Sequence, residues 1–117
     1  MHTVIETSSY FADAKAAGMT ETDRDAVVTM IASNPEAGDQ IIGTGGARNV
    51  RIAGRGKGKN GGYRVVTFYS GQDVPVFLLA VYSKGEKANL SKAERSELKA
   101  YLKDAIEQYR RGGRRYV

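Results

Sequence analysis

The sequence contains no cysteine and a single histidine, and these two shortages exclude several kinds of site. Without cysteine the chain has no disulfide, no thiolate metal ligand and no cysteine nucleophile. The one histidine, His2, stands near the start of the sequence, where a general base or a metal ligand would be hard to hold in place. We therefore expect any chemistry to come from side chains other than thiols and imidazoles.

Long hydrophobic runs are also missing. No apolar run approaches the roughly 20 residues that a membrane helix requires, and MHTVIETSSY lacks the cationic start and apolar stretch of a signal peptide. Hydrophobic residues make up 41% of the chain and charged residues 26%, which favours a globular protein over a disordered one. We expect one cytoplasmic domain over residues 1–117, with a frayed tail at 111–117 and no membrane contact.

Acidic residues are absent between Asp39 and Asp73, and the whole chain carries a net charge of +5. The cations of this stretch are Arg48, Arg51, Arg55, Lys57, Lys59 and Arg64. Charge that is segregated in this way indicates an anionic partner.

The spacing of hydrophobic residues along the chain changes from a helical period to the alternation of strands and back to a helical period. HTVIET predicts a short strand, TSSYFADAKAAG a helix capped by its serines, and Thr20 with Asp23 a capping box for a second helix. Four strands are expected in QIIGTGG, ARNVRIAG, YRVVTFYS and PVFLLAVYSK, the last of them apolar enough to be buried on both faces.

A third helix is predicted in LSKAERSELKAYLKDAIEQYR, where Ser91 and Glu94 form another capping box. Its expected apolar face consists of Leu98, Tyr101, Leu102, Ala105 and Ile106. The order of elements predicts an α+β domain, with two N-terminal helices and one C-terminal helix packed on a small, largely antiparallel sheet.

The segment GRGKGKNGGYRV has three interpretations. Gly56, Gly58 and Gly61 match a nucleotide-binding pattern, but a strand follows where the dinucleotide fingerprint needs a helix. A solvated hairpin loop is the second interpretation. The third is a groove for a polyphosphate, which the cations continuing into both flanking strands favour. Strand alternation places Arg64 on the same face as the apolar residues Val66 and Phe68. Tyr63, Tyr69 and Tyr82 are available to stack on bases.

The segment NPEAGDQIIGTGGARNVRIAGRGKGKNGGYRVVTFYS, followed by VFLLAVYSKGEKANLS, resembles the RelE/HigB group of toxins from bacterial type II toxin-antitoxin modules, particularly the HigB-like branch. The resemblance covers about residues 34–102. It implies an endonuclease that enters the ribosomal A site and cuts mRNA during translation, without a metal or another cofactor. It also implies helices on one side of the sheet and a helix-turn-helix antitoxin from the same operon, which we expect to carry an acidic segment.

The resemblance assigns roles to individual residues. It places Arg64 on the cleaved phosphate and makes Lys84 a second essential cation. The expected catalytic set is Arg64, Lys84, Lys57, Lys59 and Lys87, in which one of Lys57, Lys59 and Lys87 serves as acid or base. The expected RNA-binding set is Arg48, Arg51, Arg55 and Tyr82. Tyr82 substitutes for a base-stacking tyrosine that some relatives carry where this chain has Leu90.

The implied reaction is in-line attack of a ribose 2′-oxygen on the adjacent phosphate, stabilised by preorganised cations. Two alternatives remain on the same fold. One is a nucleic-acid-binding relative that does no chemistry, and the other is a ParE-like gyrase poison.

Overall fold

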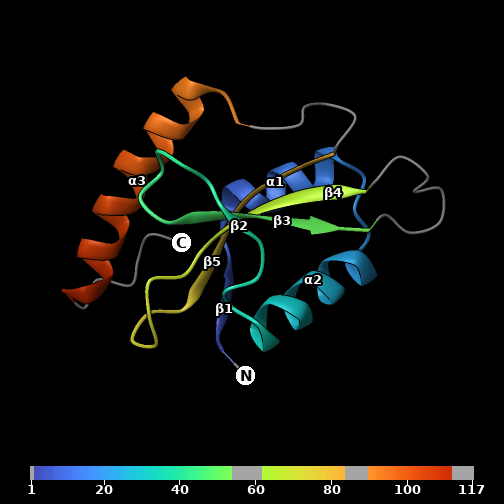
Figure 1. Ribbon diagram of the computed structural model, residues 1–117. Coiled ribbons are helices and arrows are strands. Elements are labelled where there is room, and N and C mark those ends of the chain that lie inside the picture. Colours follow the sequence, from blue (N-terminus) through green and yellow to red (C-terminus); the bar gives the residue numbers. More distant parts are fainter. Residues whose placement is uncertain (1, 54–61, 84–89, 112–117) are drawn as a thin grey trace.

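The computed structural model describes residues 2–53, 62–83 and 90–111 of the chain. The elements, in order, are β1 (Val4–Glu6), α1 (Ser8–Ala16), α2 (Glu21–Ser33), β2 (Asp39–Gln40), β3 (Ala47–Ile52), β4 (Tyr63–Phe68), β5 (Val76–Ser83) and α3 (Lys92–Arg110) (Figure 1). This is the predicted α+β order. In the described part, no helix is both long and apolar enough to cross a membrane.

The five strands form one sheet in the order β1-β5-β4-β3-β2. Only the pair of β1 and β5 is parallel, and the other three pairs are antiparallel, as predicted. The register of β4 and β5 shifts between Val66 and Thr67. Most of β5 is buried, which confirms its prediction as a strand covered on both faces.

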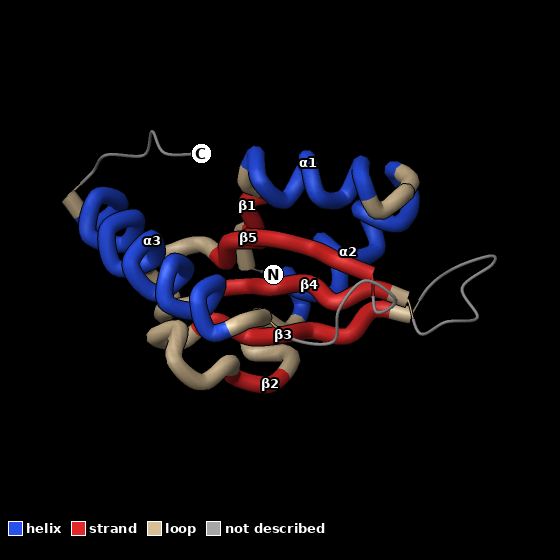
Figure 2. The backbone as a smooth tube through the Cα atoms, turned by 90° about the horizontal axis from the view of Figure 1, so that it is seen from above, coloured by secondary structure: helices blue, strands red, loops and turns tan. Residues whose placement is uncertain are grey.

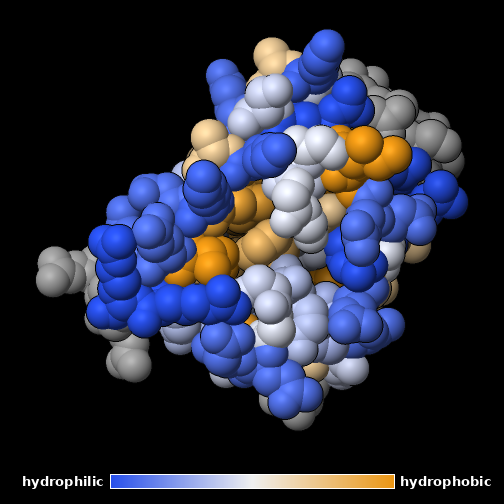
Figure 3. Space-filling model, turned by 60° about the vertical axis from the view of Figure 1, so that its left-hand side comes forward, coloured by the Kyte–Doolittle hydropathy of each residue, from blue (hydrophilic) through white to orange (hydrophobic). Residues whose placement is uncertain are grey.

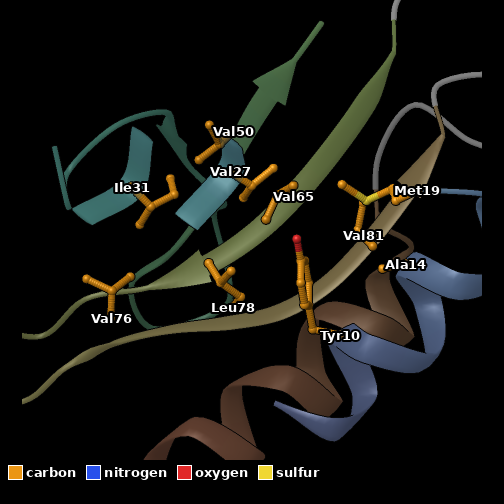
Figure 4. Packing of buried hydrophobic residues seen from close by; sticks show 10 residues of the cluster. All are labelled: Tyr10, Ala14, Met19, Val27, Ile31, Val50, Val65, Val76, Leu78 and Val81. Atoms are coloured by element: carbon orange, nitrogen blue, oxygen red, sulfur yellow. The ribbon is translucent and has the colours of Figure 1, made fainter. Parts of the chain in front are cut away.

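Helices cover both faces of the sheet, so the expectation of helices on one side is wrong. One core joins α1 and α2 to the sheet and consists of Tyr10, Ala14, Met19, Val27, Ile31, Val50, Val65, Val76, Leu78 and Val81 (Figure 4). The other lies under α3 and consists of Ala47, Val66, Phe68, Val74, Phe77, Leu79, Tyr82 and Leu102. Successive strand residues alternate between the two cores, so each strand must be apolar on both sides.

Local sequence signals set most helix ends. The capping boxes at Thr20 with Asp23 and at Ser91 with Glu94 are both present. The serines predicted to cap the first helix do not do so, because Thr7 takes that position. Its Oγ1 accepts a hydrogen bond from the Tyr10 amide at 3.3 Å and donates one to the Leu78 carbonyl at 2.8 Å, so the cap also ties α1 to β5.

Two other details differ from the predicted pattern, and one prediction is not tested. The strand expected in QIIGTGG is reduced to Asp39–Gln40, because Gly43, Gly45 and Gly46 all have positive φ and turn the chain. Tyr101 is 45% exposed instead of lying in the core of α3. Residues 112–117 of the expected frayed tail lie outside the described residues.

The outer edge of β5 is covered first by a strand and then by a helix. β1 pairs with β5 only as far as Leu78. Beyond that point α1 lies along the edge, where a carboxylate oxygen of Asp13 accepts a hydrogen bond from the Val81 amide at 3.3 Å. The Asp13 carboxylate thus accepts the hydrogen bond that a further strand would otherwise accept from the Val81 amide.

Candidate functional site

Five of the predicted site residues lie outside the described part of the chain, namely Arg55, Lys57, Lys59, Lys84 and Lys87. The described residues that border their two segments lie side by side, because Ile52 pairs with Tyr63 and Tyr63 pairs with Ser83. The strand ends that lead into both basic segments therefore meet at one end of the sheet.

Arg51, Arg64 and Tyr82 form a row across that same end of the sheet. Arg51 of β3 stands directly opposite Arg64 of β4, and Arg64 stands opposite Tyr82 of β5. All three lie on the face that α3 covers. Arg64 stands two residues before Val66 of the core under α3 and so shares its face, and Tyr82 belongs to that core itself. This is the face predicted for Arg64 from strand periodicity.

Arg64 is half-buried and incompletely paired. Its Nη1 atom is buried and has no hydrogen-bond partner among the described residues. A buried cationic donor without a partner costs free energy, and like charges placed directly across a sheet add repulsion. An anion bound between Arg51 and Arg64 would relieve both costs, so the pair has the chemistry of a phosphate site.

Tyr82 supports this row from within the core. Tyr82 is only 5% exposed, so its ring is not available for base stacking in this conformation. The Asn49 Nδ2 donates a hydrogen bond to the Tyr82 hydroxyl at 3.1 Å, while the Asn49 Oδ1 is buried without a partner among the described residues. Asn49 lies on the same face of β3 as Arg51 and thus adds an unused acceptor beside the two arginines.

Arg48 does not join the row. It alternates with Arg51 along β3 and therefore lies on the opposite face of the sheet. Its Nη1 donates to the Gly38 carbonyl at 3.1 Å, which ties β3 to the turn before β2.

Helix α3 separates its charges in a way that sequence inspection of the basic stretch missed. Plotted at 3.6 residues per turn, one flank has cations as its only charged residues, namely Lys92, Arg95, Lys99, Lys103 and Arg110. The opposite flank carries Glu94, Glu97 and Tyr101. A helical projection of the predicted helix would have found this pattern.

The cationic flank of α3 borders a hollow of about 730 Å³. Lys99 and Lys103 line it beside Thr44 and Phe68, and neither lysine forms an ion pair with a described residue. Figure 3 shows the α3 side of the molecule, with hydrophobic residues exposed in hollows between ridges of hydrophilic ones. The hollow adds cationic surface on the same face as Arg51 and Arg64.

Two described groups with a clear pKa shift, Tyr10 and Asp73, lie away from the row. Burial raises the pKa of Tyr10 to about 12, and a hydrogen bond from Arg110 lowers the pKa of Asp73. His2 is structural, with its Nε2 3.0 Å from the Val74 carbonyl and its ring edge-to-face with Tyr69. Among residues 2–53, 62–83 and 90–111, no group of His, Asp and Glu side chains is arranged to hold a metal ion.

The fold and the family are shown by comparison with known proteins. A structure of the E. coli toxin RelE, in the free state and with two arginine-to-alanine substitutions, matches with a TM-score of 0.51 and 16% sequence identity, over 90% of this chain and 97% of that one. At this identity the match shows the fold. The family model for the RelE toxin of the RelE/RelB toxin-antitoxin system matches residues 11–112. The chain therefore belongs to the RelE toxin family and is a toxin of a toxin-antitoxin system.

Proposed function

We propose that this toxin is an endoribonuclease that enters the ribosomal A site and cuts mRNA, and that Arg64 binds the scissile phosphate. The observation that carries the proposal is the opposed pair of Arg51 and Arg64, with a buried guanidinium nitrogen of Arg64 that has no hydrogen-bond partner among the described residues. The basic segments that follow β3 and β5 start at the same end of the sheet, next to Tyr63. This arrangement favours a site for a sugar-phosphate backbone.

The proposed reaction uses a nucleophile from the substrate itself. The 2′-oxygen of the ribose attacks the adjacent phosphorus, the bond from phosphorus to the 5′-oxygen breaks, and the products are a 2′,3′-cyclic phosphate and a 5′-hydroxyl. Negative charge grows on the non-bridging oxygens as the new bond forms. Arg64 donates hydrogen bonds to those oxygens, and its fixed position on a strand means that little reorganisation is needed during the reaction.

Two proton transfers accompany this step. The 2′-hydroxyl loses a proton and the 5′-oxygen gains one, and the described part of the chain places no histidine at the site. We assign these transfers to lysines of the two basic segments, with Lys84 as a second phosphate ligand and one of Lys57, Lys59 and Lys87 as acid or base. Neighbouring cations lower the pKa of a lysine and so make it a better proton carrier near neutral pH.

Induced expression in a bacterium tests this function against its rivals. We expect wild-type toxin to arrest growth and to fragment mRNA, while Arg64→Ala lowers fragmentation by a factor on the order of 100, as the loss of one donor to a developing oxyanion does. Lys15→Ala, which removes an exposed cation from α1, is the matched control and should cut as wild type does.

The same cultures separate the alternative functions. Arrest with intact mRNA and altered plasmid supercoiling would replace the proposal with a gyrase poison. Binding of RNA in vitro with no new ends in the cell would replace it with a non-catalytic nucleic-acid binder. Membership of the HigB-like branch and a helix-turn-helix antitoxin from the same operon stay predictions, which the neighbouring reading frame tests.

A further inference from the structure

A second concave surface lies on the other side of α3 from the cationic hollow. It is a groove of about 670 Å³ between α1 and α3, above the C-terminal half of β5. Its floor is apolar and includes Val66, Leu79, Ala80 and Leu98, and Tyr101 stands at its edge with 45% of its surface exposed. We call this surface the acidic groove, for the reason given next.

The charged residues of the described part of the chain that line the acidic groove have one sign. Asp13 of α1 and Glu94 and Glu97 of α3 all line it, and no lysine or arginine does so among the described residues. This is unusual in a chain whose net charge is +5. Carboxylates grouped in this way attract the cationic side chains of a partner.

The acidic groove borders the proposed RNA site without including its arginines. Tyr82 belongs to both, because it lines the groove and stands opposite Arg64 in the sheet. A partner in the groove would lie against α1, β5 and the first half of α3, next to the arginine row. The two surfaces carry opposite charge and therefore select different partners.

We propose that the acidic groove binds an amphipathic helix of the cognate antitoxin, with apolar residues on the groove floor and lysine or arginine side chains on Asp13, Glu94 and Glu97. An antitoxin is the partner that a RelE-family toxin has, so the proposal rests on the family and not on the nuclease activity. A helix fits better than an added strand, since the Val81 amide at the open edge of β5 is already bonded to Asp13. The partner segment is thus cationic, in contrast to the acidic segment expected from the overall charge of the toxin.

The test is titration of purified antitoxin into toxin variants that change charge and keep shape. The triple variant Asp13→Asn, Glu94→Gln and Glu97→Gln removes three charges, while Asn retains an acceptor for Val81 and Gln retains the capping box of α3. We expect antitoxin affinity at low salt to fall at least about tenfold, because each desolvated charge pair contributes to affinity.

The matched control neutralises three exposed carboxylates that do not line the groove, in the variant Asp25→Asn, Asp39→Asn and Asp104→Asn. Its net charge equals that of the groove variant, and we expect its antitoxin affinity to change less than about twofold. Equal weakening in both variants would mean that only the net charge matters, and unchanged binding of the groove variant would remove the site. A groove variant that alters RNA affinity but not antitoxin affinity would assign the groove to RNA and contradict the proposal.

Hydrogen exchange on the wild-type complex gives an independent answer if the triple variant does not fold. Antitoxin should slow amide exchange in α1 and in residues 90–101, and exchange in α2 should stay as it is in free toxin. Protection confined to other segments would overturn the proposal. The RNA cleavage activity of the groove variant is measured without antitoxin on the same preparation. This activity tests the nuclease proposal separately from the antitoxin site.

Discussion

Arg51 and Arg64 stand opposite each other in adjacent strands although their charges repel, and no described carboxylate bridges them. A sheet that only needed stability would place an apolar or acidic residue at one of these positions. A bound anion, as we propose, would explain the pair, and the cost of the pair to the free protein can be measured.

Arg64→Met should stabilise the free toxin. Methionine keeps the apolar stem, removes the unpartnered buried nitrogen and ends the repulsion, so we expect the free energy of unfolding to rise by on the order of 1 kcal/mol at low salt. Pyrophosphate should then stabilise wild type more than the variant. Urea denaturation with and without pyrophosphate measures both effects, and a destabilised Arg64→Met that still responds to pyrophosphate would contradict the anion site.

Tyr10 gives a prediction for alkaline pH. Burial, with a smaller contribution from Glu6, raises its pKa to about 12 in the folded protein, against 10.0 for an ordinary tyrosine. The unfolded chain therefore loses this proton at a lower pH than the folded protein does. The contribution of Tyr10 to the free energy of unfolding is complete below about pH 10 and is lost as the pH rises towards 12.

Tyr10→Phe should remove most of that loss. At about 1.4 kcal/mol per pKa unit, the wild type should lose roughly 2 to 3 kcal/mol from this residue across the window. At neutral pH the variant should be close to wild type, since the Tyr10 hydroxyl has no partner in the described part of the chain. Unfolding at pH 8 and pH 11.5 tests this, with Tyr101→Phe as an exposed control. If Tyr10→Phe and Tyr101→Phe show the same pH dependence, the assignment to Tyr10 is wrong.

At the scale of elements, the two flanks of α3 differ in charge: Lys99 and Lys103 lie towards the turn between β2 and β3, and Glu94 and Glu97 lie towards α1. Lys99→Gln should lower the slope of RNA affinity against salt by about 0.7, the value for one phosphate contact on a single strand. Lys15→Gln on α1 changes the same charge far from this flank and should leave the slope unchanged. Equal slopes for both variants, measured with a fluorescent single-stranded RNA, would show that α3 does not contact RNA.

Local signals in the sequence predicted the elements well, because capping boxes, glycine turns and strand alternation depend on residues close in the chain. Thr20, Ser91 and the face of Arg64 are examples. Thr7 replaced the expected serine caps because its hydroxyl also reaches Leu78, a contact that depends on the tertiary fold. Tyr101 likewise looked apolar enough for the core, but the neighbouring groove leaves it exposed.

At the scale of the whole molecule, α1 and α2 pack on one face of the sheet and α3 packs on the other. Figure 2 shows α3 displaced from the end of the sheet at which β3 leads into β4. The row of Arg51 and Arg64 lies at that end. The sequence predicted the cations of this end but neither the acidic groove nor the separation of Arg48, because both depend on which side of the sheet each helix covers.

The RNA ends produced by wild-type toxin and by Arg64→Ala test the proposed function most directly. Ribosomes that carry a defined message in a purified translation system should yield, with wild-type toxin, new RNA ends at the A-site codon that bear a 5′-hydroxyl and a 2′,3′-cyclic phosphate. Folded Arg64→Ala should yield on the order of 100 times fewer of these ends. Ends with a 5′-phosphate, or undiminished cutting by folded Arg64→Ala, would contradict the account.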